Sequence, residues 1–337
     1  MNAAGAAAPA GAAPDATGDA VVADALTRRF GDVTAVDALS FRVRPGELFG
    51  IVGPDGAGKT TTLRMLAGVL KPGSGDATVF GRSVMRDPEG VKAEIAYMSQ
   101  RFGLYTDLTV AENLGFYADL YEVPESERAA RYERLYKFSN LGPFKDRLAG
   151  QLSGGMKQKL GLSCALVHEP RLLLLDEPTF GVDPVSRRDL WIIVHEMVAR
   201  GVTAIVSTAY MDEAERFDRL TLLHQGKVVA LDTPVVLQRE LSGRLLGVRL
   251  VRTREAREAA LKLPGVQLAA VFGDHLHLTV DDAARRAPAI ADGLRAAGFD
   301  QAGPVEPIEP SLEDVFITRL TTGAASTPAT PLAGEKS

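Results

Sequence analysis

The sequence has very little cysteine and no long apolar run. Among its 337 residues only Cys164 is a cysteine, which excludes an internal disulfide and a metal site built from cysteines. Cys164 lies in the apolar stretch LGLSCAL, so we expect a thiol packed in the core, in a reducing compartment. The densest apolar runs, ELFGIV and RLLLLD, have the length of strands and fall well below the ~20 residues that cross a bilayer.

Basic charge is also in short supply. The chain carries 38 Lys and Arg against 43 Asp and Glu, a net charge of −5, so it lacks the basic excess that a nucleic-acid partner requires. Residues 1–22 and 321–337 are rich in Ala, Gly, Thr and Pro, and we predict two disordered tails. The first tail has no basic segment followed by bulky apolar residues, which argues against a secretory signal.

Between residues 23 and 240, short apolar runs alternate with helical periodicity. ELFGIVG, RLLLLDEP and VTAIVST each resemble a buried parallel strand followed by a turn and a helix. We therefore predict an α/β domain with a mostly parallel sheet. Residues 104–150 interrupt this alternation with two helices, TVAENLGFYADLYE and ESERAARYERLYKF, so we predict a helical insert there.

Residues 241–320 predict a second, smaller domain. The order is strand, helix, strand, strand, helix, strand, and we take EDVFI (residues 313–317) as the closing strand. This order is typical of a ferredoxin-like α+β domain. His275 and His277 alternate in one of these strands and share one face of it, where a solvated surface is favoured over a metal site.

A glycine-rich stretch matches the phosphate-loop pattern G-x-x-x-x-G-K-[ST]. FGIV precedes it as a strand and TTLRMLAGVL follows as a helix, a context that favours a phosphate site over a chance glycine-rich turn. In such a loop, backbone N–H groups surround the β- and γ-phosphates, Lys59 adds a positive charge and the Thr60 hydroxyl binds Mg²⁺. The residues predicted to bind the phosphates of ATP are Gly53, Pro54, Asp55, Gly56, Ala57, Gly58, Lys59, Thr60 and Thr61.

Two adjacent carboxylates follow the apolar strand at residues 172–175. A carboxylate at the carboxyl end of a parallel strand faces the crevice in which α/β folds bind ligands. Asp176 is therefore predicted to hold Mg²⁺, and Glu177 is predicted to be the catalytic residue that polarises the attacking water. Without the phosphate loop, charges at the start of a helix would be the better explanation of both residues.

The segment LSGGMKQ closely resembles the signature motif of ABC-type ATPases. This resemblance implies that the motif contacts the γ-phosphate of an ATP held by a second ATPase subunit, so that two chains form a head-to-tail dimer around two ATP molecules. Met156 stands where the signature usually has glutamine. The signature residues are Leu152, Ser153, Gly154, Gly155 and Met156.

Other elements of the same family follow in order. Phe30 resembles the aromatic residue that stacks on adenine, and Gln100 resembles the glutamine that joins Mg²⁺ and the attacking water to the helical insert. FGVD resembles the D-loop that crosses to the other subunit, with Gly181 and Asp183 as its marked positions. Taken singly, Phe30 and Gln100 would more often be structural.

LTVAENL, EPTFGVDP and EPSLEDVFI resemble ATP-binding subunits of ABC-2-type exporters. That likeness implies a peripheral subunit on the cytoplasmic face of the inner membrane, docked on separate permease chains that move drugs, lipids or polymers. The helical insert would receive a permease helix. The sequence does not name the cargo, because the permease selects it.

The family's switch histidine is missing. Counting through VSTAYMDEA places Ala209 where a histidine normally bonds the γ-phosphate. Losing one preorganised donor typically costs roughly 10²–10³ in rate. We therefore expect the slower half of an asymmetric ATPase pair, with homodimer or heterodimer left open. The alternatives are an ABC-type ATPase acting without a permease, for example on DNA or ribosomes, and a regulatory nucleotide-binding module.

Overall fold

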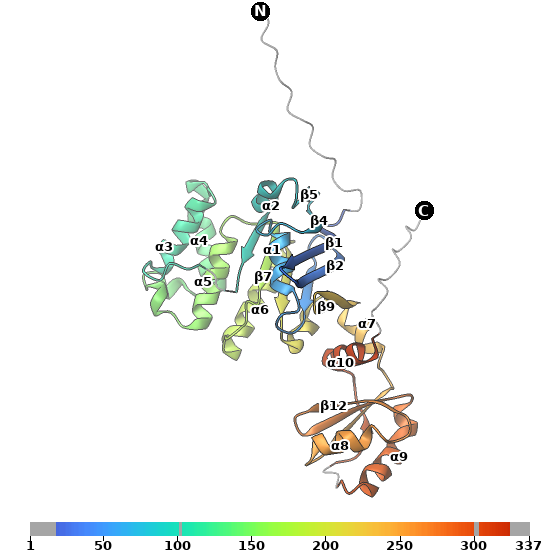
Figure 1. Ribbon diagram of the computed structural model, residues 1–337. Helices are drawn as coiled ribbons and strands as arrows, with labels where there is room; N and C mark the ends of the chain where they lie inside the picture. The colour runs from blue at the N-terminus through green and yellow to red at the C-terminus, as the bar shows by residue number, and fades with distance from the viewer. Residues whose placement is uncertain (1–17, 101–102, 300–302, 324–337) are drawn as a thin grey trace, which may run out of the picture. The chain divides into compact units, whose positions relative to one another are not determined.

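The computed structural model describes residues 18–100, 103–299 and 303–323. Its contacts divide the chain into two compact units. The first comprises residues up to 209 together with residues 225–227, and the second comprises residues 210–224 and those from 228 onward. Figure 1 labels helices and strands of both units. No helix in the described ranges is long and apolar enough to span a bilayer.

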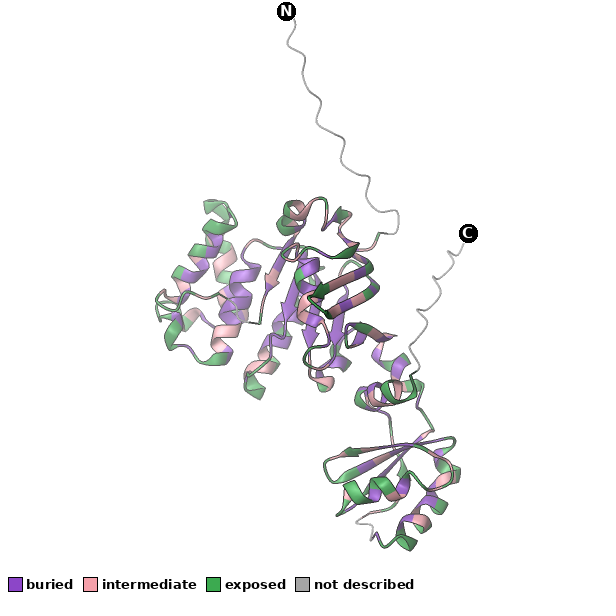
Figure 2. Ribbon diagram, viewed as in Figure 1, coloured by how far each residue is buried: buried purple, intermediate pink, exposed green. Residues whose placement is uncertain are grey.

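A parallel sheet forms the centre of the first unit. Its strands are β3 (Leu48–Val52), β8 (Thr203–Thr208), β7 (Leu172–Asp176) and β6 (Ile95–Met98), adjacent in that order. All three pairings are parallel. Every residue of β3, β7 and β8 is buried, as expected for strands covered on both faces, and Figure 2 shows this buried centre. The predicted α/β fold with a parallel core is confirmed.

A separate antiparallel sheet, which the sequence did not distinguish from the parallel core, completes the first unit. Its strand order is β2-β1-β4-β5. The turn between its first two strands is short and contains Gly31 at φ +57°, a conformation that suits glycine. The strands are β1 (Val21–Phe30), β2 (Val33–Val43), β4 (Ser74–Val79) and β5 (Arg82–Ser83).

Three helices pack together as the predicted helical insert and its continuation. They are α3 (Val110–Leu120), α4 (Glu125–Ser139) and α5 (Gly154–Leu166), and α5 contacts both of the others (Figure 1). Thr109 and Glu112 form a capping box that starts α3. The other helices of this unit are α1 (Lys59–Leu66), α2 (Pro88–Glu94) and α6 (Pro184–Ala199).

The second unit contains the predicted ferredoxin-like fold. Its antiparallel sheet has the order β12-β13-β11-β14, and α8 and α9 share one apolar core with the sheet. Strands β9 and β10, helix α7 and one 3₁₀ segment precede it. The bounds are β9 (Arg219–His224), β10 (Lys227–Asp232), α7 (Pro234–Arg239), β11 (Leu245–Arg249), α8 (Thr253–Ala260), β12 (Val266–Phe272), β13 (His275–Val280), α9 (Ala283–Ala296), β14 (Glu306–Pro307) and α10 (Leu312–Thr322).

The closing strand of this fold lies earlier than the sequence predicted. EDVFI belongs to α10, and the strand that pairs with β11 is the short β14. The physical reason is a capping box, in which Ser311 accepts from the Asp314 backbone N–H while the Asp314 carboxylate accepts from the Ser311 N–H. The prediction weighed the apolar run and missed this start signal.

The predicted tails lie mostly outside the described residues, at positions 1–17 and 324–337. Strand β1 already includes Val21, within the tail expected for residues 1–22, and α10 runs to Thr322, within the tail expected for 321–337. The predicted boundary between the two folded domains, at residues 240 and 241, stays a prediction.

Candidate nucleotide-binding site

The phosphate loop lies between β3 and α1, as its flanking sequence predicts. The Gly53 N–H donates to the Thr208 carbonyl (N···O 3.2 Å), which ties the loop to the end of β8. Gly58 adopts φ +104°, and a Cβ built there would lie 2.4 Å from the Ala35 carbonyl oxygen. Only glycine fits this position, because both the backbone angle and the neighbouring backbone exclude a side chain.

Lys59 is almost fully buried beside this loop. Its Nζ donates to the carbonyls of Gly53 (2.7 Å) and Pro54 (3.1 Å) and lies 3.0 Å from Glu177 Oε1. The side chains of Lys59 and Glu177 are only 3% and 11% exposed. Such a buried pair is strongly oriented, since either charge alone would be costly to bury.

The two predicted carboxylates lie at the carboxyl end of β7. Asp176 Oδ1 accepts from Thr60 Oγ1 (3.0 Å) and from Ser207 Oγ (2.8 Å). The Glu177 N–H donates to the same Ser207 Oγ (3.0 Å), and Glu177 itself has φ +49°. A glutamate in the left-handed region is strained, and such strain is typical of functional positions that the surrounding structure enforces.

Gln100 completes the arrangement around Glu177. Its Nε2 donates to Glu177 Oε2 (3.1 Å), while Lys59 occupies Oε1. Each carboxylate oxygen therefore has a partner from a different segment of the chain. The structure brings together Lys59, Thr60, Gln100, Asp176 and Glu177, all of which the sequence predicted for one site.

All of these residues except Asp176, which is buried behind Thr60, line an open cleft of about 540 Å³. Phe30, at the end of β1, is 48% exposed and lines this cleft, with the Arg28 guanidinium 5.0 Å from the centre of its ring. An exposed ring beside a phosphate loop suits stacking on a base. The lining residues are Phe30, Val33, Thr34, Ala35, Asp55, Gly56, Ala57, Gly58, Lys59, Thr60, Thr61, Gln100, Glu177 and Phe180.

The donor set fits Mg²⁺. Thr60 Oγ1 and Asp176 Oδ1 lie 3.0 Å apart, and the Gln100 side chain, whose Nε2 donates to Glu177 Oε2, also carries an amide oxygen. Oxygen ligands of this kind, few in number and completed by phosphate and water, are what Mg²⁺ prefers. Asp176 would hold the ion through its carboxylate and Thr60 through its hydroxyl.

The signature residues begin α5 and do not line the cleft. Ser153 caps the helix, accepting from the Met156 N–H (N···O 3.3 Å), with Leu152 before it and Gly154 as its first helical residue. A Cβ on Gly155 would lie 2.1 Å from Ser186 Oγ. The signature therefore packs directly against the start of α6, and a larger residue at Gly155 would separate the two.

The D-loop leads into α6. Gly181 adopts φ +69°, and Asp183 caps α6 by accepting from the N–H groups of Val185 and Ser186. The hydrogen bonds from Ser186 hold the pKa of the Asp183 carboxyl below its usual range. The D-loop conformation is thus fixed at both of its marked positions.

Ala209 comes directly after β8, at the same edge of the sheet as the cleft. The two residues before it bond to the site: Ser207 holds Asp176 and Glu177, and the Thr208 carbonyl holds Gly53. Position 209 therefore follows directly on the residues that hold the carboxylates and the phosphate loop. The methyl group of alanine has no hydrogen-bond donor to offer there.

Sequence reasoning missed Ser207 and Ser186. Ser207 pairs with Asp176 in the register between β7 and β8 and bonds both Asp176 and Glu177. The only signal was its position at the end of VTAIVST, because the ends of neighbouring parallel strands meet at one edge. Ser186 gave no signal, since its contact with Gly155 depends on how two helices meet.

Fold and site together define a phosphate-loop nucleotide-binding protein. The ABC transporter family profile matches residues 36–180. The daunorubicin resistance ATP-binding protein DrrA3 of Streptomyces coeruleorubidus is 33% identical over 303 residues, covering 88% of this chain and 95% of that protein. The chain therefore belongs to the family of ABC transporter ATP-binding proteins.

Another relative is more similar but much longer. The probable multidrug ABC transporter ATP-binding protein YbhF of Escherichia coli is 44% identical over 319 residues, which are 93% of this chain and 54% of that protein. The chain thus spans about half the length of this relative.

Solved structures share the fold of about two thirds of this chain. The ATP-binding subunit of an ABC transporter superposes with a TM-score of 0.60 at 30% identity, over 65% of this chain and 92% of that one. An ATP-binding cassette in its ADP conformation gives 0.58 at 26% identity, over 63% and 90%.

Proposed function

We propose that this chain binds MgATP in the cleft beside the phosphate loop and powers a membrane exporter of the ABC-2 type. The observation that carries the proposal is the position of Glu177, held between Lys59 and Gln100 at the mouth of the phosphate loop. Both carboxylate oxygens and the backbone N–H of Glu177 are held by residues of three other segments, which fixes the carboxylate beside the phosphate loop.

Each residue of the site has a chemical task in ATP hydrolysis. Lys59 offers a positive charge to the β- and γ-phosphates, for which it would exchange its contacts with the loop carbonyls and Glu177. Asp176, Thr60 and Gln100 would hold Mg²⁺, which offsets the charge of the phosphates. Glu177 would then orient a water molecule and accept its proton during in-line attack on the γ-phosphorus.

The signature supports a site shared between two ATPase subunits. Residues 152–156 begin a helix, and N-termini of helices favour anions, yet none of these residues lines the chain's own cleft. We infer that they cap an ATP held by a second subunit, of the same or a different sequence. The packing of Gly155 against Ser186 would link this signature to the D-loop within one chain.

Ala209 makes this chain the slower half of the pair. Lys59 is paired with Glu177, and Asp176 accepts a hydrogen bond from Thr60, so these residues are in place for hydrolysis. What is missing is the hydrogen-bond donor at position 209. We expect tight binding of ATP with slow turnover here, while the signature completes a faster site on a partner that has the histidine.

The helical insert offers a surface for the permease. Tyr105 and Phe116 make an edge-to-face contact (ring centres 4.5 Å apart), and both are substantially exposed, as are Leu120 and Tyr121. Clusters of exposed aromatic and aliphatic side chains mark interaction surfaces. Docking there would place the chain on the cytoplasmic face of the cell membrane.

The decisive experiment is steady-state ATP hydrolysis by the purified chain, alone and with a candidate partner subunit. We expect slow turnover alone, a marked increase with the partner, and roughly a 10²–10³-fold increase in the Ala209→His variant. The proposal would be overturned if the chain alone hydrolysed ATP rapidly and the Glu177→Gln variant did so at the same rate.

A regulatory nucleotide-binding module is the second candidate, and Ala209 is the observation that favours it. The same variant separates the two functions. If Ala209→His binds ATP normally but gains no turnover, the remaining machinery is not competent and the regulatory function holds. Co-purification of this chain with permease subunits from membranes would distinguish a transporter subunit from an ATPase that acts without one.

A further inference from the structure

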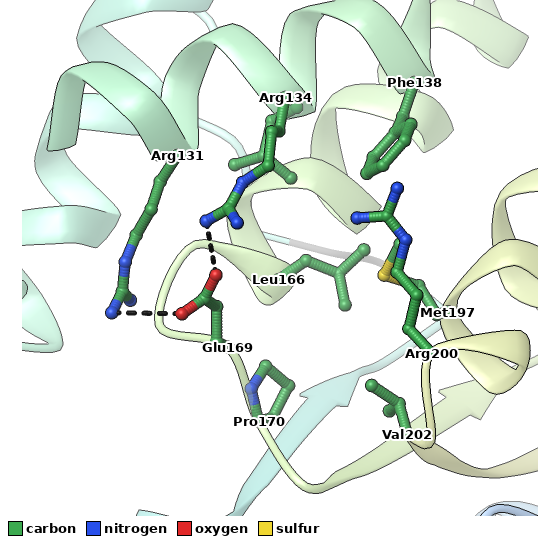
Figure 3. Close-up of a pocket in the computed structure, with 10 residues that line it drawn as sticks. Arg131, Arg134, Phe138, Leu166, Glu169, Pro170, Met197, Arg200 and Val202 are labelled. Atoms are coloured by element: carbon green, nitrogen blue, oxygen red, sulfur yellow. Dashed lines mark hydrogen bonds and ion pairs between the residues drawn. The ribbon is translucent and has the colours of Figure 1, made fainter. Parts of the chain in front are cut away.

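A second hollow lies on the first unit, away from the nucleotide cleft. It measures about 220 Å³ and is enclosed by α4, the end of α5, the segment before β7 and the end of α6 (Figure 3). For scale, a cavity of roughly 150 Å³ is enough to hold benzene. The lining residues are Arg131, Arg134, Leu135, Phe138, Leu166, Glu169, Pro170, Met197, Arg200 and Val202.

The floor of the hollow is apolar. Leu135, Leu166 and Met197 are buried, and Phe138, Pro170 and Val202 extend the same surface toward the rim. Figure 3 shows the leucine, methionine and valine side chains directed at one central space. An apolar group of one ring or a short alkyl chain would fill this space and lose contact with water.

The rim is positively charged. Three arginines face one carboxylate, Glu169, which pairs with both Arg131 and Arg134. Arg131 also bonds to Glu127 and to the Val167 carbonyl, so its donors are occupied. Arg134 pairs with Glu169 and Arg131 with Glu127, so the positive charge left without a carboxylate among the described residues is that of Arg200.

Arg200 has no acidic partner among the residues that the structure describes. Its guanidinium lies over the Phe138 ring, 4.4 Å from the ring centre, and no acceptor of its hydrogen bonds occurs within those same ranges. Stacking uses the face of the guanidinium and leaves the N–H groups at its edge directed outward. Such an edge binds a carboxylate in a two-pronged arrangement.

We propose that this hollow binds a small amphipathic carboxylate, with its apolar body on the Leu166 and Met197 floor and its carboxylate on Arg200 and Arg134. A space of about 220 Å³ favours a small molecule over a peptide helix. The site would join the helical insert to α5, the helix that begins at the signature, over about 20 Å.

The test uses the full-length protein and two probes, 4-phenylbutyrate and octanoate, with the corresponding neutral amides. Ligand-observed NMR and calorimetry should give saturable binding of at least one carboxylate, with a dissociation constant on the order of 1 mM or tighter for a probe of about 12 heavy atoms. The amide should bind at least about tenfold more weakly, since it loses the charged hydrogen bonds. Preference between the probes identifies a ring or an alkyl chain as the apolar body.

Arg200→Gln should weaken binding by about tenfold or more, whereas Arg188→Gln, an exposed arginine of α6 outside the hollow, should not. Val202→Phe fills the space and should abolish binding while ATP binding persists. If that variant loses its cooperative melting transition, Arg134→Gln takes its place. Equal binding of acid and amide, unchanged binding by Arg200→Gln, or no saturable binding of either probe up to about 20 mM, some twentyfold above the expected constant, would overturn the proposal.

Discussion

The two ends of the central strands differ in how their charges are balanced. At the carboxyl ends of β7 and β8, the charged side chains of Lys59, Asp176 and Glu177 are buried and each has hydrogen-bonded partners. At the amino ends, beside Pro170 and Val202, arginines outnumber carboxylates around an apolar floor. The first arrangement is preorganised for phosphate chemistry, and the second is left with unsatisfied positive charge.

This difference shows where the chain tolerates change. A buried ion pair that loses one partner leaves an uncompensated charge, which is strongly unfavourable. An exposed ion pair contributes little, because solvent screens it. Substitutions at the carboxyl ends should therefore have large effects on activity and stability, and substitutions at the amino ends should act mainly on whatever binds there.

The largest effect is expected for Glu177→Gln. We expect turnover to fall by at least about 10²-fold, because the amide cannot accept a proton from water. The measurement belongs in an Ala209→His background, where hydrolysis is fast enough to follow. ATP binding should remain, and a variant that keeps its turnover would remove Glu177 from the mechanism.

Ser207→Ala should have the next largest effect. It removes one hydrogen bond to Asp176 and one from the Glu177 N–H, both buried, and should lower the free energy of unfolding by about 1–3 kcal/mol. Chemical denaturation measures this. The control is Ser163→Ala, a buried serine whose hydroxyl donates to the Lys159 carbonyl within its own helix, which should cost less than about 1 kcal/mol. Equal losses in the two variants would mean that Ser207 merely packs.

Much of the cleft could be predicted from the sequence, because the parts of the cleft are continuous segments of the chain. The phosphate loop, Asp176 with Glu177, and the signature each occupy a few consecutive residues next to a strand or a helix. Ser207 was missed since its role depends on the register between β7 and β8. The hollow was missed for the same reason: its walls come from residues 131–138, 166–170 and 197–202, which meet only in the folded chain.

The wrong prediction of a strand at EDVFI has a different cause. The apolar residues of this segment suit a strand. However, Ser311 and Asp314, which are three residues apart, form a capping box that starts a helix, and this local signal decided the structure. The overall α+β order was still predicted, because the other strands and both core helices have clear patterns. Short apolar runs near a capping sequence are therefore poor evidence for a strand.

Glu169→Gln should have a small effect on stability and a measurable one on binding. Its ion pairs with Arg131 and Arg134 are exposed on the carboxylate side, so the free energy of unfolding should change by less than about 1 kcal/mol. Removing this carboxylate should raise the affinity for 4-phenylbutyrate roughly two- to fivefold, because a competing negative charge is lost. A large fall in melting temperature would show that the ion pairs at the amino ends of the strands contribute as much to stability as those at the carboxyl ends.

The smallest effect is expected for the pH dependence of stability caused by His168, which also lies near the amino ends of the central strands. Burial lowers the pKa of this imidazole, the hydrogen bond with the Ile95 carbonyl opposes the shift, and Arg131 adds to it. The folded state thus favours neutral His168, and this preference contributes to the free energy of unfolding. The contribution is complete above the pKa of the unfolded state, about 6.5, and is lost as the pH falls through the lower pKa of the folded state. Unfolding measured from pH 7 to 5 should show a shallower decline for His168→Gln, and an identical slope would contradict this assignment.

The binding of nucleotide to Lys59 tests the account most directly. Calorimetric titration with ATP and Mg²⁺ should give saturable binding to the wild-type chain, and Lys59→Ala should bind at least about tenfold more weakly. Lys92→Ala, which removes an exposed lysine paired with Glu89, should bind as the wild type does. If Lys59→Ala binds MgATP with wild-type affinity, the cleft beside the phosphate loop is not the nucleotide site.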